Sequence, residues 1–206
     1  MNSQVRAIRH RARGFTMIEV MIAVAVIAIV MAMAITQMQP AVQQSRANAG
    51  MAEVVSAFRT AQSYAVSYRR FVQVSFPSYP GVNANQLQVT IKNSMTPNAG
   101  NDVIFATYAL EGSVYYQKYT GMPDTPDAFG NATAVNFEGV DGGPTTGMFF
   151  QPDGTFVDST GNPVNGTVFL GVNNFASSAR AITILGSTGR VKSYHTNGTN
   201  AWKQAY

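Results

Sequence analysis

The chain has 206 residues, no cysteine, two histidines, and 14 Lys+Arg against 10 Asp+Glu, which gives a formal net charge of +4. The lack of cysteine excludes disulfides and cysteine-based metal or nucleophile chemistry, and the length favours one anchor helix with one modest globular domain. The positive charge does not indicate nucleic-acid binding, because Arg6, Arg9, Arg11 and Arg13 precede residue 15 and the remainder balances ten basic against ten acidic residues.

The first predicted element is an apolar helix over residues 15–35, in which only Thr16 and Glu19 are polar. A helix of these 21 residues extends about 31 Å, enough to cross a hydrocarbon core of roughly 30 Å. The arginines before it carry no acidic neighbour, so the positive-inside rule places residues 1–14 in the cytoplasm. Glu19 is the anomaly, because an ionisable group in such a helix costs roughly 2.5–3.5 kcal/mol and marks a functional position.

Two simpler interpretations of this segment stay open. A secretory signal peptide would be cleaved after Ala34, at a small-x-small site, and would release a soluble periplasmic protein. A plain single-span anchor would keep the segment. Neither gives Glu19 a role, and the apolar run exceeds the usual signal-peptide core of roughly 7–15 residues.

A second helical stretch is predicted over residues 36–70. Pro40 is expected to interrupt and kink it, because proline removes one backbone hydrogen bond. Beyond Pro40, apolar residues recur at alternating spacings of four and three, which predicts one face of an amphipathic helix that packs on a sheet. These residues are Ala47, Met51, Val54, Phe58, Ala61, Ala65 and Tyr68. Polar residues off that face are Arg46, Glu53, Ser56, Arg59 and Ser63.

Residues 71–206 read as strands separated by Gly, Pro, Asn and Asp. Strands are predicted at 71–76, 87–91, 103–108, 114–119, 134–137, 148–150, 167–170, 181–185 and 190–194. Residues 77–85 and 96–102 are expected to form loops, and residues 121–147 a long excursion. The predicted fold class is α+β, with a long N-terminal transmembrane-plus-amphipathic helix packed on an antiparallel β-sheet domain.

The segment from Arg13 to Glu19 resembles the processing site of type IV pilins and type II secretion pseudopilins. It combines a basic leader, Gly14, Phe15 and Glu19 ahead of an uninterrupted apolar run. The resemblance implies that a prepilin peptidase cuts between Gly14 and Phe15 and that the new N-terminal Phe15 is N-methylated. It also implies that Glu19 guides assembly by pairing with the N-terminal amine of a neighbouring subunit, which would give a buried carboxylate its partner.

The same resemblance implies four regions: a cleaved cytoplasmic leader at 1–14, a transmembrane helix at 15–35, its amphipathic continuation at 36–70, and a β-rich domain at 71–206. The protein would be a single-pass protein of the bacterial inner membrane with a cytoplasmic N-terminus. Its C-terminal domain would lie in the periplasm or in an extracellular filament. Its partners would be the prepilin peptidase, other pilin or pseudopilin subunits and the inner membrane.

Three further segments are similar to the pseudopilin H family, which includes GspH-like pseudopilins and FimT-like minor pilins. They are residues 57–65 leading into the first strand, residues 149–156, and the closing hairpin at 181–191. In FimT-like proteins a C-terminal Gly-Arg-x-Arg motif is linked to DNA binding during natural transformation. Here it reads Gly189-Arg190-Val191-Lys192, and lysine keeps the charge but loses the bidentate fork of arginine.

DNA binding through Arg190 and Lys192, with Arg180 and Lys203 nearby, is therefore the alternative function. The two motif cations would share one face of a strand, beside Tyr194 and Trp202. The competing interpretation is an ordinary hairpin with solvated charges, in which Tyr194 and Trp202 serve packing. No catalytic motif is recognisable, so the chain is expected to be a structural subunit, with neither enzymatic activity nor a cofactor or metal.

Overall fold

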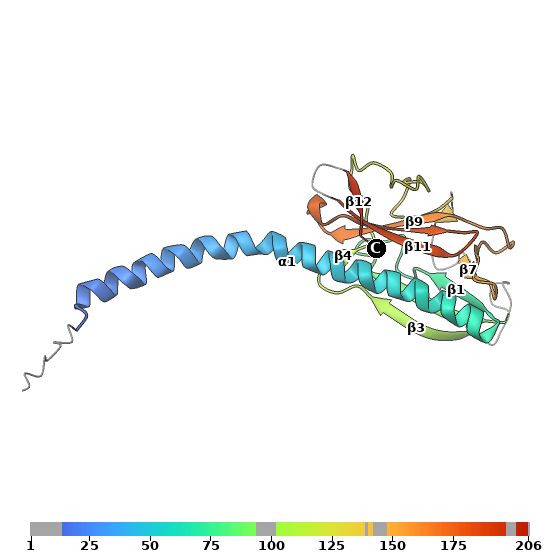
Figure 1. Cartoon of the computed structure of the whole chain (residues 1–206), viewed down its shortest axis with the longest axis horizontal. Coiled ribbons are helices and arrows are strands. Elements are labelled where there is room, and N and C mark those ends of the chain that lie inside the picture. The colour runs from blue at the N-terminus through green and yellow to red at the C-terminus, as the bar shows by residue number, and fades with distance from the viewer. Residues whose placement is uncertain (1–13, 94–101, 139, 142–147, 197–200, 206) are drawn as a thin grey trace, which may run out of the picture. The chain divides into compact units, whose positions relative to one another are not determined.

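A computed structural model describes residues 14–93, 102–138, 140–141, 148–196 and 201–205 (Figure 1). The elements in the N-terminal half are α1 (Met17–Tyr68), β1 (Phe71–Ser75), β2 (Gln86–Lys92), β3 (Val103–Ala109) and β4 (Val114–Tyr115). Those in the C-terminal half are β5 (Val135–Phe137), β6 (Val140–Asp141), β7 (Met148–Phe150), β8 (Phe156–Val157), β9 (Gly166–Val172), η1 (Ala176–Ser178), β10 (Arg180–Leu185), β11 (Arg190–Thr196) and β12 (Trp202–Gln204). The predicted α+β class is confirmed.

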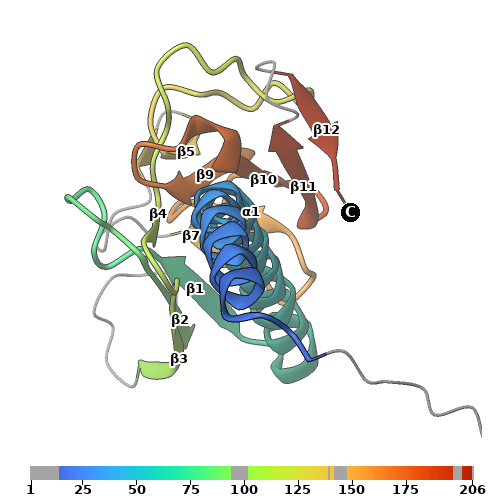
Figure 2. The same cartoon turned by 90° about the vertical axis from the view of Figure 1, so that its left-hand side faces the viewer.

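The strands form two antiparallel sheets where the sequence indicated one. The first has the order β3-β2-β1-β7-β8, and the second the order β12-β11-β10-β9-β5-β6, with β4 also paired to β9. The C-terminal half of α1 runs between them, with β1 to β3 on one side and β9 to β11 on the other (Figure 2). One helix therefore supplies the apolar layer that both sheets cover.

The helix α1 is continuous through Pro40, so the expectation that this proline interrupts it is wrong. Proline lacks a backbone N–H, so one helical hydrogen bond is missing at Pro40. The hydrogen bonds of the neighbouring peptide groups keep the chain helical on both sides of it. Contacts divide the chain into two compact units, residues 1–41 and Val42–Tyr206, so the long helix belongs to both.

The predicted apolar face of α1 forms the centre of the domain core. All of its predicted members are buried except Tyr68, which is 64% exposed at the end of the helix. Phe58 is fully buried and meets Phe150 and Phe156 edge-on, with ring centroids 6.4 and 6.2 Å apart. Edge-to-face geometry of this kind adds to the free energy gained by burying the rings.

The predicted strands lie at the same positions along the chain as observed strands, but several differ from them in length. The strand predicted at 114–119 ends at Tyr115, although the Gln117 N–H still bonds to the Phe169 carbonyl oxygen on β9, while the Tyr116 N–H bonds to that of Ala84. Three strands have no counterpart among the predictions: β6, β8 and β12. Each has only two or three residues, too few for a two-residue periodicity to be read.

Candidate functional site

The start of α1 is built by a pair of reciprocal hydrogen bonds. Thr16 Oγ1 accepts a bond from the Glu19 backbone N–H at 3.3 Å, and the Glu19 carboxylate accepts one from the Thr16 N–H at 3.5 Å. This is a capping box, in which side chains accept hydrogen bonds from N–H groups at the start of the helix; the Glu19 N–H also bonds to the Thr16 carbonyl oxygen at 3.1 Å. A carboxylate in the first turn also interacts favourably with the helix dipole. Glu19 therefore has a role within its own chain.

The capping role of Glu19 was readable from the sequence and was missed. The spacing Thr16-x-x-Glu19 ahead of an apolar run is the sequence signature of a capping box. Gly14 and Phe15 precede the helix, and Phe15 is 81% exposed.

The first turns of α1 expose a continuous apolar surface. Most large side chains from Met17 to Met33 are at least half exposed, on every side of the helix. Within the described residues, α1 is the one helix long and apolar enough to cross a membrane, by length and composition alone, and a signal sequence would pass the same test. An apolar helix surface of this size requires a lipid or protein environment.

The cations predicted to contact DNA differ in their surroundings. Arg190 is exposed and follows Gly189, whose positive φ of 63° makes the turn from β10 into β11. Lys203 is also exposed, on β12, where it pairs in register with His195. Lys192 and Arg180 are engaged by other groups of the chain, so the structure does not bring the four cations together as one open surface.

Lys192 belongs to a polar cluster centred on Asp127. The Asp127 carboxylate accepts hydrogen bonds from Lys192 Nζ at 2.5 Å, Thr183 Oγ1 at 2.6 Å and Tyr194 Oη at 2.8 Å. Burial raises the pKa of Asp127, but these hydrogen bonds and the Lys192 charge outweigh it, so the net pKa is lowered. The loop that carries Asp127 is thereby held against the outer face of β10 and β11.

Arg180 is only 4% exposed and faces the helix. Its Nε donates to Asn48 Oδ1 at 2.7 Å, and its Nη1 donates to the Ala179 carbonyl oxygen at 2.8 Å. Burial lowers the pKa of Arg180, and the nearby Tyr119 opposes that shift. The guanidinium thus joins the second sheet to α1.

The aromatic residues of the closing hairpin serve packing. Tyr194 is 3% exposed, and the Trp202 ring lies 5.9 Å from that of Phe169. Trp202 Nε1 also donates to the Pro123 carbonyl oxygen at 3.0 Å, which ties β12 to the same loop that carries Asp127. Neither ring stands free as a stacking platform for a base.

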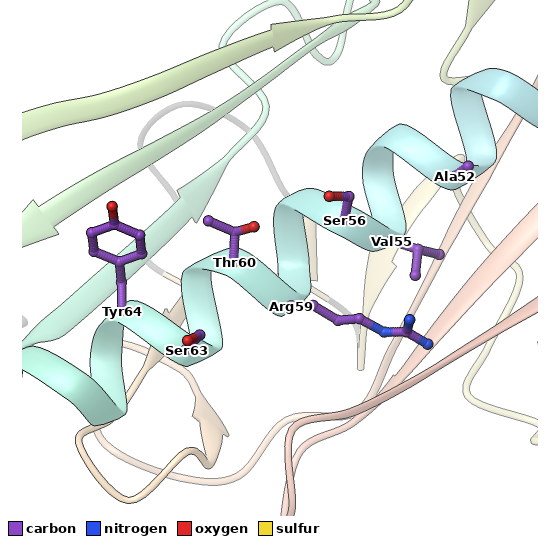
Figure 3. Close-up of a pocket in the computed structure, with 7 residues that line it drawn as sticks. All are labelled: Ala52, Val55, Ser56, Arg59, Thr60, Ser63 and Tyr64. Atoms are coloured by element: carbon purple, nitrogen blue, oxygen red, sulfur yellow. The ribbon is translucent and has the colours of Figure 1, made fainter.

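The surface of the domain has two hollows of substantial volume. One, of about 450 Å³, lies along α1 and is lined by Ala52, Val55, Ser56, Arg59, Thr60, Ser63 and Tyr64. Figure 3 shows Ser56, Thr60 and Tyr64 directed to one side of the helix and Arg59 extended to the other. The second, of about 620 Å³, is lined by the loop at 127–132 with Asn136, Glu138 and Asn165.

Neither hollow combines a nucleophile with a general base. Within the described ranges, no group of three or more His, Cys, Asp and Glu side chains could hold a metal ion. His195, on β11, has its pKa lowered by burial and by the charges of Arg180 and Lys203.

Residues 9–35 match the profile of the prokaryotic N-terminal methylation motif. Two crystal forms of the type IV minor pilin FimU of Pseudomonas aeruginosa resemble the chain in structure. One has 15% identity and a TM-score of 0.46, over 82% of this chain and 96% of FimU. The other has 16% identity and a TM-score of 0.43, over 73% and 90%. No curated protein matches the chain.

The Asp127 cluster predicts a pH-dependent stability. Because the pKa of Asp127 is lowered in the folded chain, its contribution is present in full above the unfolded pKa of about 4 and is lost as pH falls through the lowered value. Asp127→Asn is expected to cost about 1–3 kcal/mol at pH 7. Denaturant unfolding from pH 7 to pH 3 measures both effects.

A double-mutant cycle with Lys192→Met supplies the control for this prediction. The two substitutions should be strongly non-additive if the carboxylate and the ammonium act through one another. Additive losses, or an unchanged pH slope in Asp127→Asn, would contradict the assignment of the stability to this cluster.

Proposed function

We propose that the protein is a minor pilin or pseudopilin, a structural subunit of a type IV pilus or a type II secretion pseudopilus. The match of residues 9–35 to the N-terminal methylation motif carries this proposal. The exposed apolar surface of α1 supports it, because a filament core or a membrane would cover that surface. The absence of a catalytic arrangement in the described residues is compatible with a subunit that assembles without performing chemistry.

Maturation at the junction of Gly14 and Phe15 follows from the same motif. A prepilin peptidase would remove residues 1–14, most of which lie outside the described residues, and Phe15 would be methylated. The apolar helix would stay in the inner membrane until assembly, with the β domain in the periplasm or in the extracellular filament. In this proposal the subunit is a minor component, which the resemblance of residues 57–65, 149–156 and 181–191 to GspH-like and FimT-like proteins supports.

Glu19 would act twice in such a subunit. The one capping bond that its carboxylate accepts, from the Thr16 N–H, is long, at 3.5 Å, and exposed, so the carboxylate is able to accept a stronger partner. Cleavage creates a positive amine at Phe15, and in a packed bundle of helices the amine of one subunit and the Glu19 of another would neutralise each other. Charge pairing would then set the axial register between subunits.

The mature N-terminus tests the proposal directly. Mass spectrometry of the protein purified from membranes of the native host should find a chain that begins at Phe15 and is one methyl group heavier than the unmodified sequence. A chain that begins at Ile35 would instead identify a cleaved signal peptide and overturn the proposal.

Substitution of Glu19 separates its two roles. Glu19→Gln keeps a side-chain acceptor for the Thr16 N–H but removes the charge, whereas Glu19→Ala removes both. Both variants are expected to be processed at Phe15 and to stay in the membrane fraction, absent from sheared filaments. Normal filament incorporation of Glu19→Gln would show that capping alone is required.

A second candidate function, DNA binding, is favoured by the exposure of Arg190 beside the turn at Gly189 and of Lys203 on β12. The full chain in detergent micelles should then shift labelled duplex DNA in a salt-dependent manner. Arg190→Ala with Lys203→Ala should abolish the shift, while Arg59→Ala, which removes an exposed cation from α1, should not. No shift at low salt, or equal loss in the control, would remove this candidate.

A further inference from the structure

The strand β3 is an open edge of the first sheet. It ends the strand order and pairs only with β2 among the described strands. It has seven residues, whereas the other strands that end a sheet, β6, β8 and β12, have two or three. Short edge strands prevent unwanted pairing between chains, so a long one offers unpaired backbone N–H and C=O groups to a partner.

The residues of β3 do not protect this edge with charge or proline. The strand reads Val-Ile-Phe-Ala-Thr-Tyr-Ala, and its first three side chains, Val103, Ile104 and Phe105, are 58%, 61% and 38% exposed. A register shift between Val89 and Thr90 leaves Phe105 as a bulge, where its ring lies 4.1 Å from that of Tyr64. Regular backbone remains available from Ala106 to Ala109.

The exposed apolar surface continues from β3 onto the end of α1. The Tyr64 ring stacks on that of Tyr68 at 5.2 Å, and Tyr68 is 64% exposed. We call Tyr68, Val103, Ile104 and Phe105 the β3 edge patch. A contiguous apolar surface on a sheet edge is characteristic of an interaction site.

Two arginines border the β3 edge patch. Arg69 and Arg70 follow Tyr68 directly, and the pairings Phe71 with Lys92 and Ile91 with Val103 bring this end of β1 close to the start of β3. Both arginines are exposed, and neither forms an ion pair with a described residue. Residues 94–101, which lie outside the described part, contain no acidic residue that could neutralise them.

Near Val103, at the start of β3, the other charged side chains Lys92 and Asp102 neutralise each other. Lys92 is 5% exposed and is held by Asp102 at 2.7 Å, so it adds no free charge. At the opposite end of β3 lie Glu111 and Glu53, whose pKa is raised by burial and by the Glu111 charge. Arg46 packs against Gly112 beside Glu111, so charges of both signs occur at that end. The edge therefore has a positive end beside Val103 and a mixed end beyond Ala109.

We propose that β3 binds an extended, mainly apolar strand of a partner protein, with acidic residues of that strand beside Arg69 and Arg70. Antiparallel addition would place the carboxyl-terminal end of the partner strand at Val103, because paired antiparallel strands run in opposite directions. Main-chain hydrogen bonds would supply affinity, and the arginines would select the charge. The inference goes beyond the proposed function, since it holds whether or not the chain enters a filament.

A synthetic peptide tests the proposal without any filament assembly. The probe alternates valine and threonine and carries a pair of glutamates at its carboxyl end; a matched peptide carries a pair of lysines instead. The full chain in detergent micelles is expected to bind the glutamate peptide, measured by fluorescence anisotropy, and to gain hydrogen-exchange protection at β3 amides. The lysine peptide should bind roughly tenfold more weakly.

Matched variants make the outcome decisive. Ile104→Asp should abolish binding, whereas Val82→Asp, at a position 96% exposed and outside the patch, should not. Arg69→Glu with Arg70→Glu should reverse the preference between the two peptides, and circular dichroism checks that each variant is folded. Failure of both peptides to bind, equal effects of the two aspartate variants, or a micelle-bound dimer whose β3 amides are already protected would overturn the proposal.

Discussion

The structure depends on one constraint: a single helix must bury its apolar residues in two different environments. In its C-terminal half the apolar side chains form one stripe, and two sheets cover that stripe around Phe58. In its N-terminal half they surround the helix, and no described part of the chain covers them. Since burial of apolar surface is the dominant favourable term in folding and association, the C-terminal half of α1 directs the fold of the domain. The N-terminal half presents an apolar surface that a membrane or other protein chains would cover.

Cationic side chains in the interior of the domain have polar partners, whereas several on its surface have none among the described residues. Arg180, Lys92 and Lys192 are each held by a polar partner, namely Asn48, Asp102 and Asp127. A buried or half-buried charge without a partner would cost several kcal/mol, and these contacts avoid that cost. The exposed cations with no ion-pair partner among the described residues are Arg46, Arg59, Arg69, Arg70, Lys118, Arg190 and Lys203. Recognition of an anionic partner by the domain would therefore rest on these cations.

Glu19 links the local structure of the helix to the proposed assembly. In the isolated chain its carboxylate caps the helix through Thr16, which stabilises the N-terminus before any partner arrives. Replacing a long capping bond by a hydrogen bond to a charged amine is favourable, because charge-assisted hydrogen bonds are roughly twice as strong as neutral ones. In the proposed assembly, one side chain would therefore cap its own helix and then contact the N-terminal amine of a neighbouring subunit.

The sequence by itself determined the long helix, its buried face, the approximate position of most strands and the motif at Gly14 and Phe15, because periodicity and spacing are local properties of a chain. It also contained the Thr16-x-x-Glu19 spacing of a capping box, which the structure shows in use. Only the tertiary structure decided that there are two sheets, that Pro40 leaves α1 unbroken, and that Asp127 holds Lys192 while Arg180 turns inward. These outcomes depend on which segments pair across the fold. Asp127 and Lys192 lie 65 residues apart, and no local pattern encodes a contact over such a separation.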